Sequence, residues 1–405
     1  MKKIVVLGAG YAGLKTVVLL QKKLKDSVKI TLVDRNDYHY EAADLHEVAA
    51  GMQKPSRISY LIKDLVKPQI TTFIQDEVKK VNPDGHTVEL ANHQKPLSYD
   101  YCVIGLGFVS ATFGINGVEE NALPMTNVNE ALAIYDHIVD KMKDYRKSQN
   151  PDDLNIIICG GGFTGIELAG ALVDARPKLA EIAGVVPDKI KVTIIEASTR
   201  LLPMFSDKLA KYGINLVKNL GVTLLDGSRI SKIEPGKVFF KHGDDDQEQT
   251  MAAGTIIWTT GVSGSPIMAA SGFNERRGRV MVTDHLTDPD HDDVYILGDV
   301  AAVMPPDSDR PYPTTAQIAL SMADYTAEDI AARVKTGHHE SKPFTYKSLG
   351  TVASVGNTRG FGEAMGHELK GYPASAMKKI IADRSLMEVG GLKELFAKGR
   401  FDLYH

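Results

Sequence analysis

Short apolar runs alternate with helix-like stretches from the first residues of the chain. Residues 3–7 form a β-branched run, a helical pattern begins near residue 11, and a second apolar run covers residues 29–33 and ends in Asp34. Runs of this length on either side of an amphipathic stretch are typical of a strand, helix, strand unit with parallel strands. The amino-terminal part is therefore predicted to begin a parallel α/β domain.

The same order of elements returns in the middle of the chain. Residues 154–159 form a strand-like run, a helix opens at 166–170, and residues 191–196 form a second strand that ends in an acid. Pro177 and Pro187 mark an insertion between that helix and the second strand. The repeat predicts the fold class, which is an α/β protein with two Rossmann-like dinucleotide-binding domains.

Each first strand leads into glycines spaced as Gly-x-Gly-x-x-Gly. The first glycine lets the chain turn out of the strand, the second lets a pyrophosphate approach the backbone, and the third lets the helix pack on the sheet. Free N–H groups at the helix N-terminus then favour phosphate. The two loops contain Gly8, Gly10, Tyr11, Ala12 and Gly13 in the first unit and Gly160, Gly162, Phe163, Thr164 and Gly165 in the second. Two complete loops predict that two nucleotides bind, one in each domain.

An acid ends the second strand of each unit. Asp34, followed by Arg35, and Glu196 are both placed to accept a hydrogen bond from a ribose hydroxyl. A carboxylate at Glu196 would also repel a 2′-phosphate, which favours NADH over NADPH, although Arg200 lies four residues further on.

Later strand ends carry features of a flavin site. A buried strand is predicted over residues 99–107, and it ends in glycines, including Gly107, where a ligand can approach closely. The strand before Gly298 leads to Asp299, an acid that can bind ribityl hydroxyls. A threonine-capped helix then opens around Ala316, and its dipole would stabilise the negative charge of a reduced flavin. A capped surface helix is the alternative interpretation.

Glu167, near the start of the second nucleotide-binding helix, has two interpretations. Acids favour the first turn of any helix because they complement its dipole. The functional interpretation is a carboxylate that handles protons near the nicotinamide or the flavin.

Composition limits the other classes of function. A net charge of −4 with neutral histidines does not indicate nucleic-acid binding. Cys102 and Cys159 are predicted to be small buried strand residues, and no Cys-x4-Cys pair lies near residues 41–51, which excludes thiol-disulfide chemistry there. His39 and His46 lack the spacing of a metal site and are interpreted as surface or cofactor-side residues, so no metal is predicted.

The carboxyl-terminal part combines apolar and basic residues at helical spacing. Its apolar positions are Met377, Ile380, Ile381, Met387, Leu392, Leu395 and Phe396, and its basic neighbours include Lys378, Lys379 and Arg384. Such a segment can dock on an anionic membrane surface, or it can pack on the core or on a second subunit. No signal peptide and no run of about 18–20 apolar residues is present, so a cytoplasmic or cytoplasmic-face location is expected.

These motifs together resemble the type II NADH:quinone oxidoreductases, single-subunit flavoenzymes with a glutathione-reductase-like fold. The matching segments cover residues 8–14, 37–40, 161–167, 196–197, 202–205, 314–319, 350–356, 377–381 and 398–401. One departure is Leu320-Ser321-Met322, where the family usually carries a second quinone-site glutamine. The resemblance extends over nearly the whole chain.

The resemblance implies FAD in the first module, NADH in the second and a quinone, with menaquinone expected, near the carboxyl-terminal segment. It implies Glu167 and Gln317 as catalytic residues. The implied cofactor contacts add Val78, Gly107, Asp299, Ala316 and Gly261 to the two glycine loops and their acids. The implied quinone or membrane contacts are Gln317, Ile318, Lys378 and Lys379. A homodimer attached peripherally to the cytoplasmic face of the membrane is expected.

The expected domain order is an FAD-binding part over 1–150, an NADH-binding domain over 151–265, the second FAD-binding part over 266–340, and a quinone-site and membrane-docking segment over 341–405. Three alternative functions remain. They are a soluble NADH-dependent reductase or oxidase with a protein or oxygen acceptor, a slowly turning-over redox sensor, and a sulfide:quinone oxidoreductase, which would need better placed cysteines.

Overall fold

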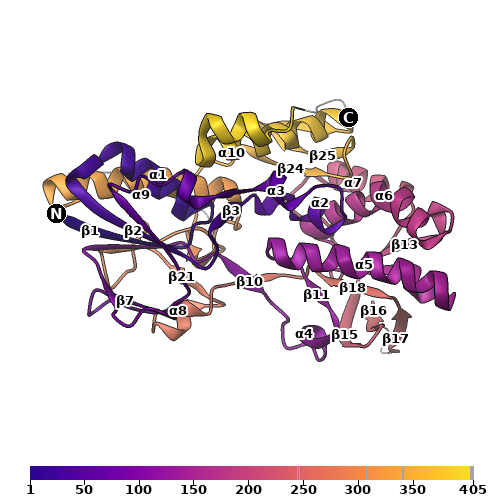
Figure 1. Ribbon diagram of the computed structural model, residues 1–405. Helices are drawn as coiled ribbons and strands as arrows, with labels where there is room; N and C mark the ends of the chain where they lie inside the picture. Colours follow the sequence, from indigo (N-terminus) through magenta and orange to yellow (C-terminus); the bar gives the residue numbers. More distant parts are fainter. Residues whose placement is uncertain (244, 246, 307, 340–341, 402–405) are drawn as a thin grey trace.

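Two five-stranded parallel sheets form the framework of the protein (Figure 1). The computed structural model describes residues 1–243, 245, 247–306, 308–339 and 342–401. The first sheet has the order β22-β9-β1-β2-β5, from Val294–Ile296, Tyr101–Ile104, Lys2–Leu7, Val28–Asp34 and Thr71–Gln75. The second has the order β11-β18-β12-β13-β14, from Leu123–Pro124, Thr255–Trp258, Asn155–Cys159, Lys191–Ile195 and Val222–Leu225. The two Rossmann-like sheets predicted from the sequence are therefore confirmed.

Helices cover the sheets because the strands are apolar on both faces. Helices α1 (Tyr11–Lys23) and α9 (Ala316–Thr336) share one core with the first sheet, and α5 (Val128–Ser148), α6 (Phe163–Ala183) and α7 (Asp207–Asn219) share another with the second. The opposite face of the second sheet packs on the meander β15-β16-β17, formed by Ser228–Glu234, Lys237–His242 and Gln249–Ala252. Edge strand β11 and helix α5 thus pack with the second sheet although they precede residue 151.

Smaller elements complete each module and connect the two. The first module also contains β3 (Tyr38–Tyr40), β4 (Ser59–Leu61), β6 (Val78–Asn82), β7 (Thr87–Leu90), β8 (Leu97–Ser98), α8 (Ile267–Ala270), β20 (Glu275–Arg276), β21 (Arg279–Met281) and β23 (Ala301–Ala302). Helices α2 (Leu45–Ala49) and α3 (Pro55–Ile58) bury their apolar residues in the core of the second module. Helix α4 is Val118–Asn121. The chain crosses between the sheets through the antiparallel pair β10 (Phe108–Ser110) and β19 (Val262–Gly264).

The carboxyl-terminal part lies across both modules (Figure 1). Strands β24 (Gly350–Ser354), β25 (Gly360–Ala364) and β26 (His367–Lys370) form an antiparallel sheet on which α10 (Tyr372–Lys398) packs. Gly391, with φ 76°, interrupts the helical backbone of α10. Within the described residues, no helix combines the length and the apolar character needed to cross a bilayer.

The expected start of the insertion at Pro177 is wrong. Helix α6 runs through Pro177 to Ala183, so the insertion begins only at Gly184, the residue that caps the helix. A proline removes one hydrogen bond from a helix interior. Buried Ala175, Leu179 and Ala180 around it show that tertiary packing carries the helix past this position.

Candidate active site

A cleft of about 500 Å³ follows the first glycine loop. Gly10 has open space where a Cβ would lie, whereas a Cβ on Gly13 would come within 1.9 Å of the Gly8 carbonyl oxygen. Helix α1 begins at this loop without a side-chain cap, which leaves its amides available to an anion. These observations agree with the steric roles expected for the glycines, and the cleft fits the pyrophosphate of a dinucleotide such as FAD.

Most of the predicted FAD contacts line this cleft. They are Gly8, Gly10, Tyr11, Ala12, Asp34, Arg35, Val78, Gly107, Asp299 and Ala316. Gly13 lies behind the loop, where it permits the helix to pack. Burial raises the pKa of Asp299 to about 6, although Arg279 and Thr314 oppose the shift. A half-buried acid after the carboxyl end of β22 is thus available to hydroxyl groups of a ligand.

The two strand-end acids, which are expected to bind a ribose hydroxyl, already accept hydrogen bonds from the backbone of the protein. Asp34 accepts hydrogen bonds from the backbone N–H groups of Ala9 (2.6 Å) and Asn36 (2.8 Å). Glu196 accepts from Gly161 (2.7 Å) and Ser198 (2.8 Å). Each carboxylate therefore holds its own glycine loop in shape, and a ribose hydroxyl would share an oxygen that is already bonded.

The second glycine loop repeats the first. Gly160 has φ +117°, Gly162 faces open space, and a Cβ on Gly165 would lie 2.0 Å from the carbonyl oxygen of Gly160. Helix α6 also starts without a side-chain cap. The Phe163 ring packs on Phe205, with centroids 5.6 Å apart, so this predicted cofactor contact serves at least partly as core.

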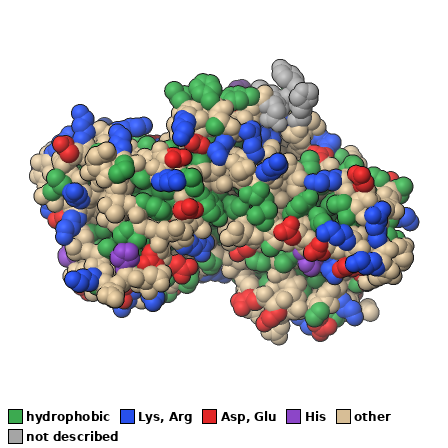
Figure 2. Space-filling model, viewed as in Figure 1, with side chains coloured by type: hydrophobic (Ala, Val, Ile, Leu, Met, Phe, Trp, Pro, Cys, Tyr) green, Lys and Arg blue, Asp and Glu red, His purple; other side chains and the backbone are tan. Residues whose placement is uncertain are grey.

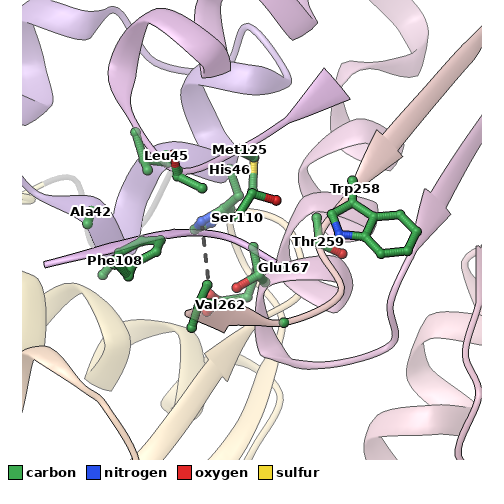
Figure 3. Close-up of a pocket in the computed structure, with 14 residues that line it drawn as sticks. Ala42, Leu45, His46, Phe108, Ser110, Met125, Glu167, Trp258, Thr259 and Val262 are labelled. Carbon is green, nitrogen blue, oxygen red and sulfur yellow. Dashed lines mark ion pairs between the residues drawn. The ribbon is translucent and has the colours of Figure 1, made fainter. Parts of the chain in front are cut away.

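A cavity of about 120 Å³ lies where the two modules meet (Figure 3). It shares Ala42, Ala43 and Phe108 with the FAD cleft, and Thr164 and Gly261 of the predicted NADH site line its other side. This arrangement places a junction between the two nucleotide sites.

Glu167 points into this cavity from α6 (Figure 3). It is the fifth residue of the helix, which has no acidic residue in its first turn, so the helix-dipole interpretation loses its support. Its Oε1 lies 2.9 Å from Lys378 Nζ and accepts from the Ser354 N–H, and its Oε2 lies 4.0 Å from His46 Nδ1. Burial alone would raise the pKa of Glu167, but Lys378, His46 and Ser354 hold it below its ordinary value.

The two lysines predicted as quinone or membrane contacts point inward. Lys379 is buried and the Lys378 side chain is only 17% exposed, so neither belongs to an exposed basic edge of α10. Lys378 pairs with Glu167 because the first turns of α10 pack over β24, which carries Ser354. Nearby Asp44 has its pKa raised to about 7 by burial and by Glu47, against the opposing effect of Lys378.

The structure separates the two predicted quinone contacts on α9. Ile318 is 2% exposed and belongs to the core of the first module, so it is not available as a membrane contact. Thr315 caps the helix by accepting from Ile318 N–H, as the threonine pattern predicted. Gln317 is half-buried, and its Oε1 accepts from Tyr346 Oη (2.6 Å) and from the Leu349 N–H (2.8 Å).

His39 and His46, which the sequence predicts to be surface or cofactor-side residues, are not surface residues. His39 lines the FAD cleft and His46 lines the junction cavity, and both are buried. The cysteines are buried and free as predicted, and burial raises the pKa of both thiols. Neither thiol is therefore suited to act as a nucleophile.

A histidine and aspartate cluster lies away from these cavities. His285, Asp329 and His339 bring potential ligand atoms within 4.8 Å of one another. The imidazoles of His285 and His339 stack, and both nitrogens of His339 already contact carboxylates, those of Asp329 and Asp292. These contacts are those of an ion-pair network between α9 and the loop before β22.

Comparisons with known proteins agree with this architecture. Residues 2–323 match the family described as pyridine nucleotide-disulphide oxidoreductase. The fold and the paired glycine loops thus define a two-nucleotide oxidoreductase of that class.

Closer relatives narrow the class. The chain is 41% identical over 403 residues to the type II NADH:quinone oxidoreductase of Staphylococcus haemolyticus and 38% identical to that of Staphylococcus aureus, with 99% of each protein covered. This chain belongs to the type II NADH:quinone oxidoreductase family.

Solved structures share the fold at lower identity. NDH2 from Plasmodium falciparum in complex with NADH superimposes with a TM-score of 0.88 at 18% identity, covering 98% of this chain and 97% of that one. The sulfide:quinone oxidoreductase of Aquifex aeolicus gives a TM-score of 0.78 at 21% identity, covering 96% and 91%. The same fold therefore supports more than one chemistry.

Proposed function

We propose that this protein is an FAD-dependent NADH:quinone oxidoreductase that carries out NADH + quinone + H⁺ → NAD⁺ + quinol without pumping protons. The observation that carries the proposal is the junction cavity, which joins the FAD cleft to the second glycine loop and contains Glu167. Bound FAD supplies the chemistry by accepting a hydride from NADH and passing two electrons to the quinone.

The residues of the chain position the reactants and hold a proton. Gly10 and the amide groups of α1 would bind the FAD pyrophosphate, and Gly162 with α6 would bind that of NADH. Holding the nicotinamide against the flavin removes much of the entropic barrier of a bimolecular step. Glu167 is the proposed proton-handling group, because it is a buried side chain that lines the junction cavity and Lys378 keeps its carboxylate charged there.

We propose menaquinone as the native acceptor and Gln317 as a quinone contact. Tyr346 and Leu349 both donate to Gln317 Oε1, so the amide group is fixed with its N–H₂ side turned away from them. In that orientation Gln317 acts as a donor to a quinone carbonyl oxygen.

The choice between quinone and other acceptors is tested by steady-state turnover. We expect rapid NADH oxidation with a soluble menaquinone analogue and slow oxidation with oxygen alone. Turnover with oxygen that is as fast as turnover with quinones would indicate a soluble oxidase. Tight NADH binding with negligible turnover by any acceptor would indicate a redox sensor.

We further propose that α10 docks the enzyme on the cytoplasmic face of the membrane. Figure 2 shows apolar side chains gathered over this helix, with basic side chains beside them. The exposed apolar residues of α10 include Ile380, Ile381, Met387, Leu392 and Phe396, and Phe401 is exposed just after the helix. Their position away from the core supports a contact with lipid or with a second copy of the chain, as in a homodimer.

Vesicle binding distinguishes these two partners. Leu392→Glu or Phe396→Glu is expected to weaken co-sedimentation with phosphatidylglycerol vesicles about tenfold, because each residue buries apolar area worth about 1.5–3 kcal/mol. Val186→Glu is the matched control, since Val186 is as exposed as Leu392 but lies in the second module. Unchanged vesicle binding, with a dimer that dissociates in the α10 variants, would assign the face to a second subunit.

A further inference from the structure

The ion pair between Glu167 and Lys378 joins two cavities. Glu167 lines the junction cavity, whereas Lys378 lines a smaller cavity of about 10 Å³ together with Asp44. A cavity of this size has room for about one water molecule. Its wall also contains the half-buried residues Asn357, Ala382 and Arg400. The second cavity therefore lies between the ion pair and the surface of the protein.

Asp44 is a buried acid in the wall of this second cavity, and its residue is 7% exposed. Burial is the main cause that raises the pKa of Asp44 to about 7, and the neighbouring carboxylate of Glu47 adds to the shift. Lys378 and Arg400 oppose it, so the pKa stays close to neutrality. Asp44 is therefore able both to release and to take up a proton near neutral pH.

The other titratable groups around Asp44 come from three elements. They are Tyr11 of α1, Glu41 at the start of the same short helix and Lys379 of α10. Of these, Glu41 acts in the same direction as Glu47, because a second negative charge disfavours ionisation of Asp44.

The two members of the ion pair hold opposite charges at neutral pH. Burial alone would raise the pKa of Glu167, but Lys378 and His46 hold it below its ordinary value, so the carboxylate is ionised. Burial alone would lower the pKa of Lys378, but Glu167 raises it, so the amine is protonated. His46 is neutral, because burial lowers its pKa. Glu167 thus has no proton of its own for a quinone and must receive one.

We propose that Asp44 supplies the proton that Glu167 delivers during quinone reduction, with Lys378 as the relay between them. The Lys378 ammonium group gives a proton to Glu167, so that an N–H bond breaks and an O–H bond forms. Asp44 restores the ammonium group, directly or through one water molecule, and then takes a proton from the solvent. The cluster returns to its starting charge, and the one proton that the reaction consumes has entered from the medium. This inference rests on the proposed function.

Asp44→Asn tests the relay. The amide group fills the same space as the carboxyl group but releases no proton, so quinone reduction is expected to slow about tenfold at neutral pH, while flavin reduction by NADH keeps its wild-type rate. Anaerobic rapid mixing follows both half-reactions over the neutral and alkaline range. Wild-type quinone reduction should fall at least about tenfold as the pH rises above about 7, because Asp44 then has no proton to supply. This fall should be absent in Asp44→Asn.

Glu47→Gln keeps Asp44 but removes a charge that raises its pKa, so the alkaline fall should move to lower pH. Asp26→Asn, at an exposed position in the first module, is the matched control and should keep the wild-type rate and profile. A wild-type rate and profile in Asp44→Asn would overturn the relay. If Asp44→Asn fails to fold, Glu47→Gln decides, because an unshifted fall contradicts the role of Asp44. Wild-type protein that reduces no quinone at any pH would instead overturn the proposed function.

Discussion

Glu167→Gln is expected to slow quinone reduction about a hundredfold, while reduction of the bound flavin by NADH stays near the wild-type rate. The amide can still accept from Lys378 and Ser354, so the local geometry is kept, but it cannot take up or release a proton. The two half-reactions are measured separately by rapid mixing without oxygen. Glu181→Gln, an exposed position near the end of the same helix, is the control. If Glu167→Gln and Glu181→Gln reduce the quinone at equal rates, Glu167 has only a structural role.

The same substitution should also change stability and its pH dependence. Glu167→Gln leaves the half-buried Lys378 without its closest counter-charge, which we expect to cost about 3 kcal/mol of unfolding free energy at neutral pH. The lowered pKa of Glu167 means that its ion pair contributes stability above its ordinary value of 4.5 and loses it as pH falls through the lowered pKa. The variant should therefore lose less stability than the wild type between neutral and acid pH in chemical denaturation. An identical acid profile would show that the pair contributes little.

Gly162→Ala is expected to impair NADH binding, whereas Gly165→Ala is expected to lower the stability of the fold. An alanine at 162 meets nothing within 4 Å in the protein and fills the space a pyrophosphate would use, so the KM for NADH should rise at least about tenfold with stability unchanged. An alanine at 165 would place its Cβ 2.0 Å from the Gly160 carbonyl oxygen and should cost about 2–3 kcal/mol of unfolding free energy.

The corresponding substitutions in the first glycine loop, Gly10→Ala and Gly13→Ala, extend this test to FAD. Gly10→Ala should lose FAD affinity but keep the fold, whereas Gly13→Ala should lose stability, because its Cβ would meet the Gly8 carbonyl oxygen. NADH titrations and FAD reconstitution read the two losses independently. A loss of FAD binding in Gly162→Ala, or of NADH binding alone in Gly10→Ala, would reverse the assignment of the modules.

The local parts of this site could be predicted from the sequence. A glycine loop specifies its own geometry through the contact between its first and third glycines, and Asp34 and Glu196 close their loops over short distances. The threonine cap of α9 is likewise predictable from the sequence, because capping depends on residues that are close together in the chain.

The contacts between residues far apart in the chain could not be predicted from the sequence. Lys378 and Glu167 are far apart in the chain, and only the packing of α10 over β24 brings them together. The resemblance implies Ile318 as a quinone or membrane contact, but it does not show that this side of α9 packs into the first module, which leaves Ile318 no access to a membrane. Gly391 also breaks a face that the sequence pattern presents as continuous, because a glycine inside a helical pattern does not reveal its φ angle.

In the proposed reaction, electrons from NADH reach a quinone through FAD held in the first module. Anaerobic stopped-flow measurement of flavin absorbance tests it most directly, with NADH mixed first and a soluble menaquinone analogue second. We expect rapid bleaching of the flavin by NADH, followed by rapid recovery with the quinone. Bleaching without recovery would contradict the quinone assignment, and FAD-loaded protein that NADH does not bleach would contradict the pairing of the two nucleotide sites.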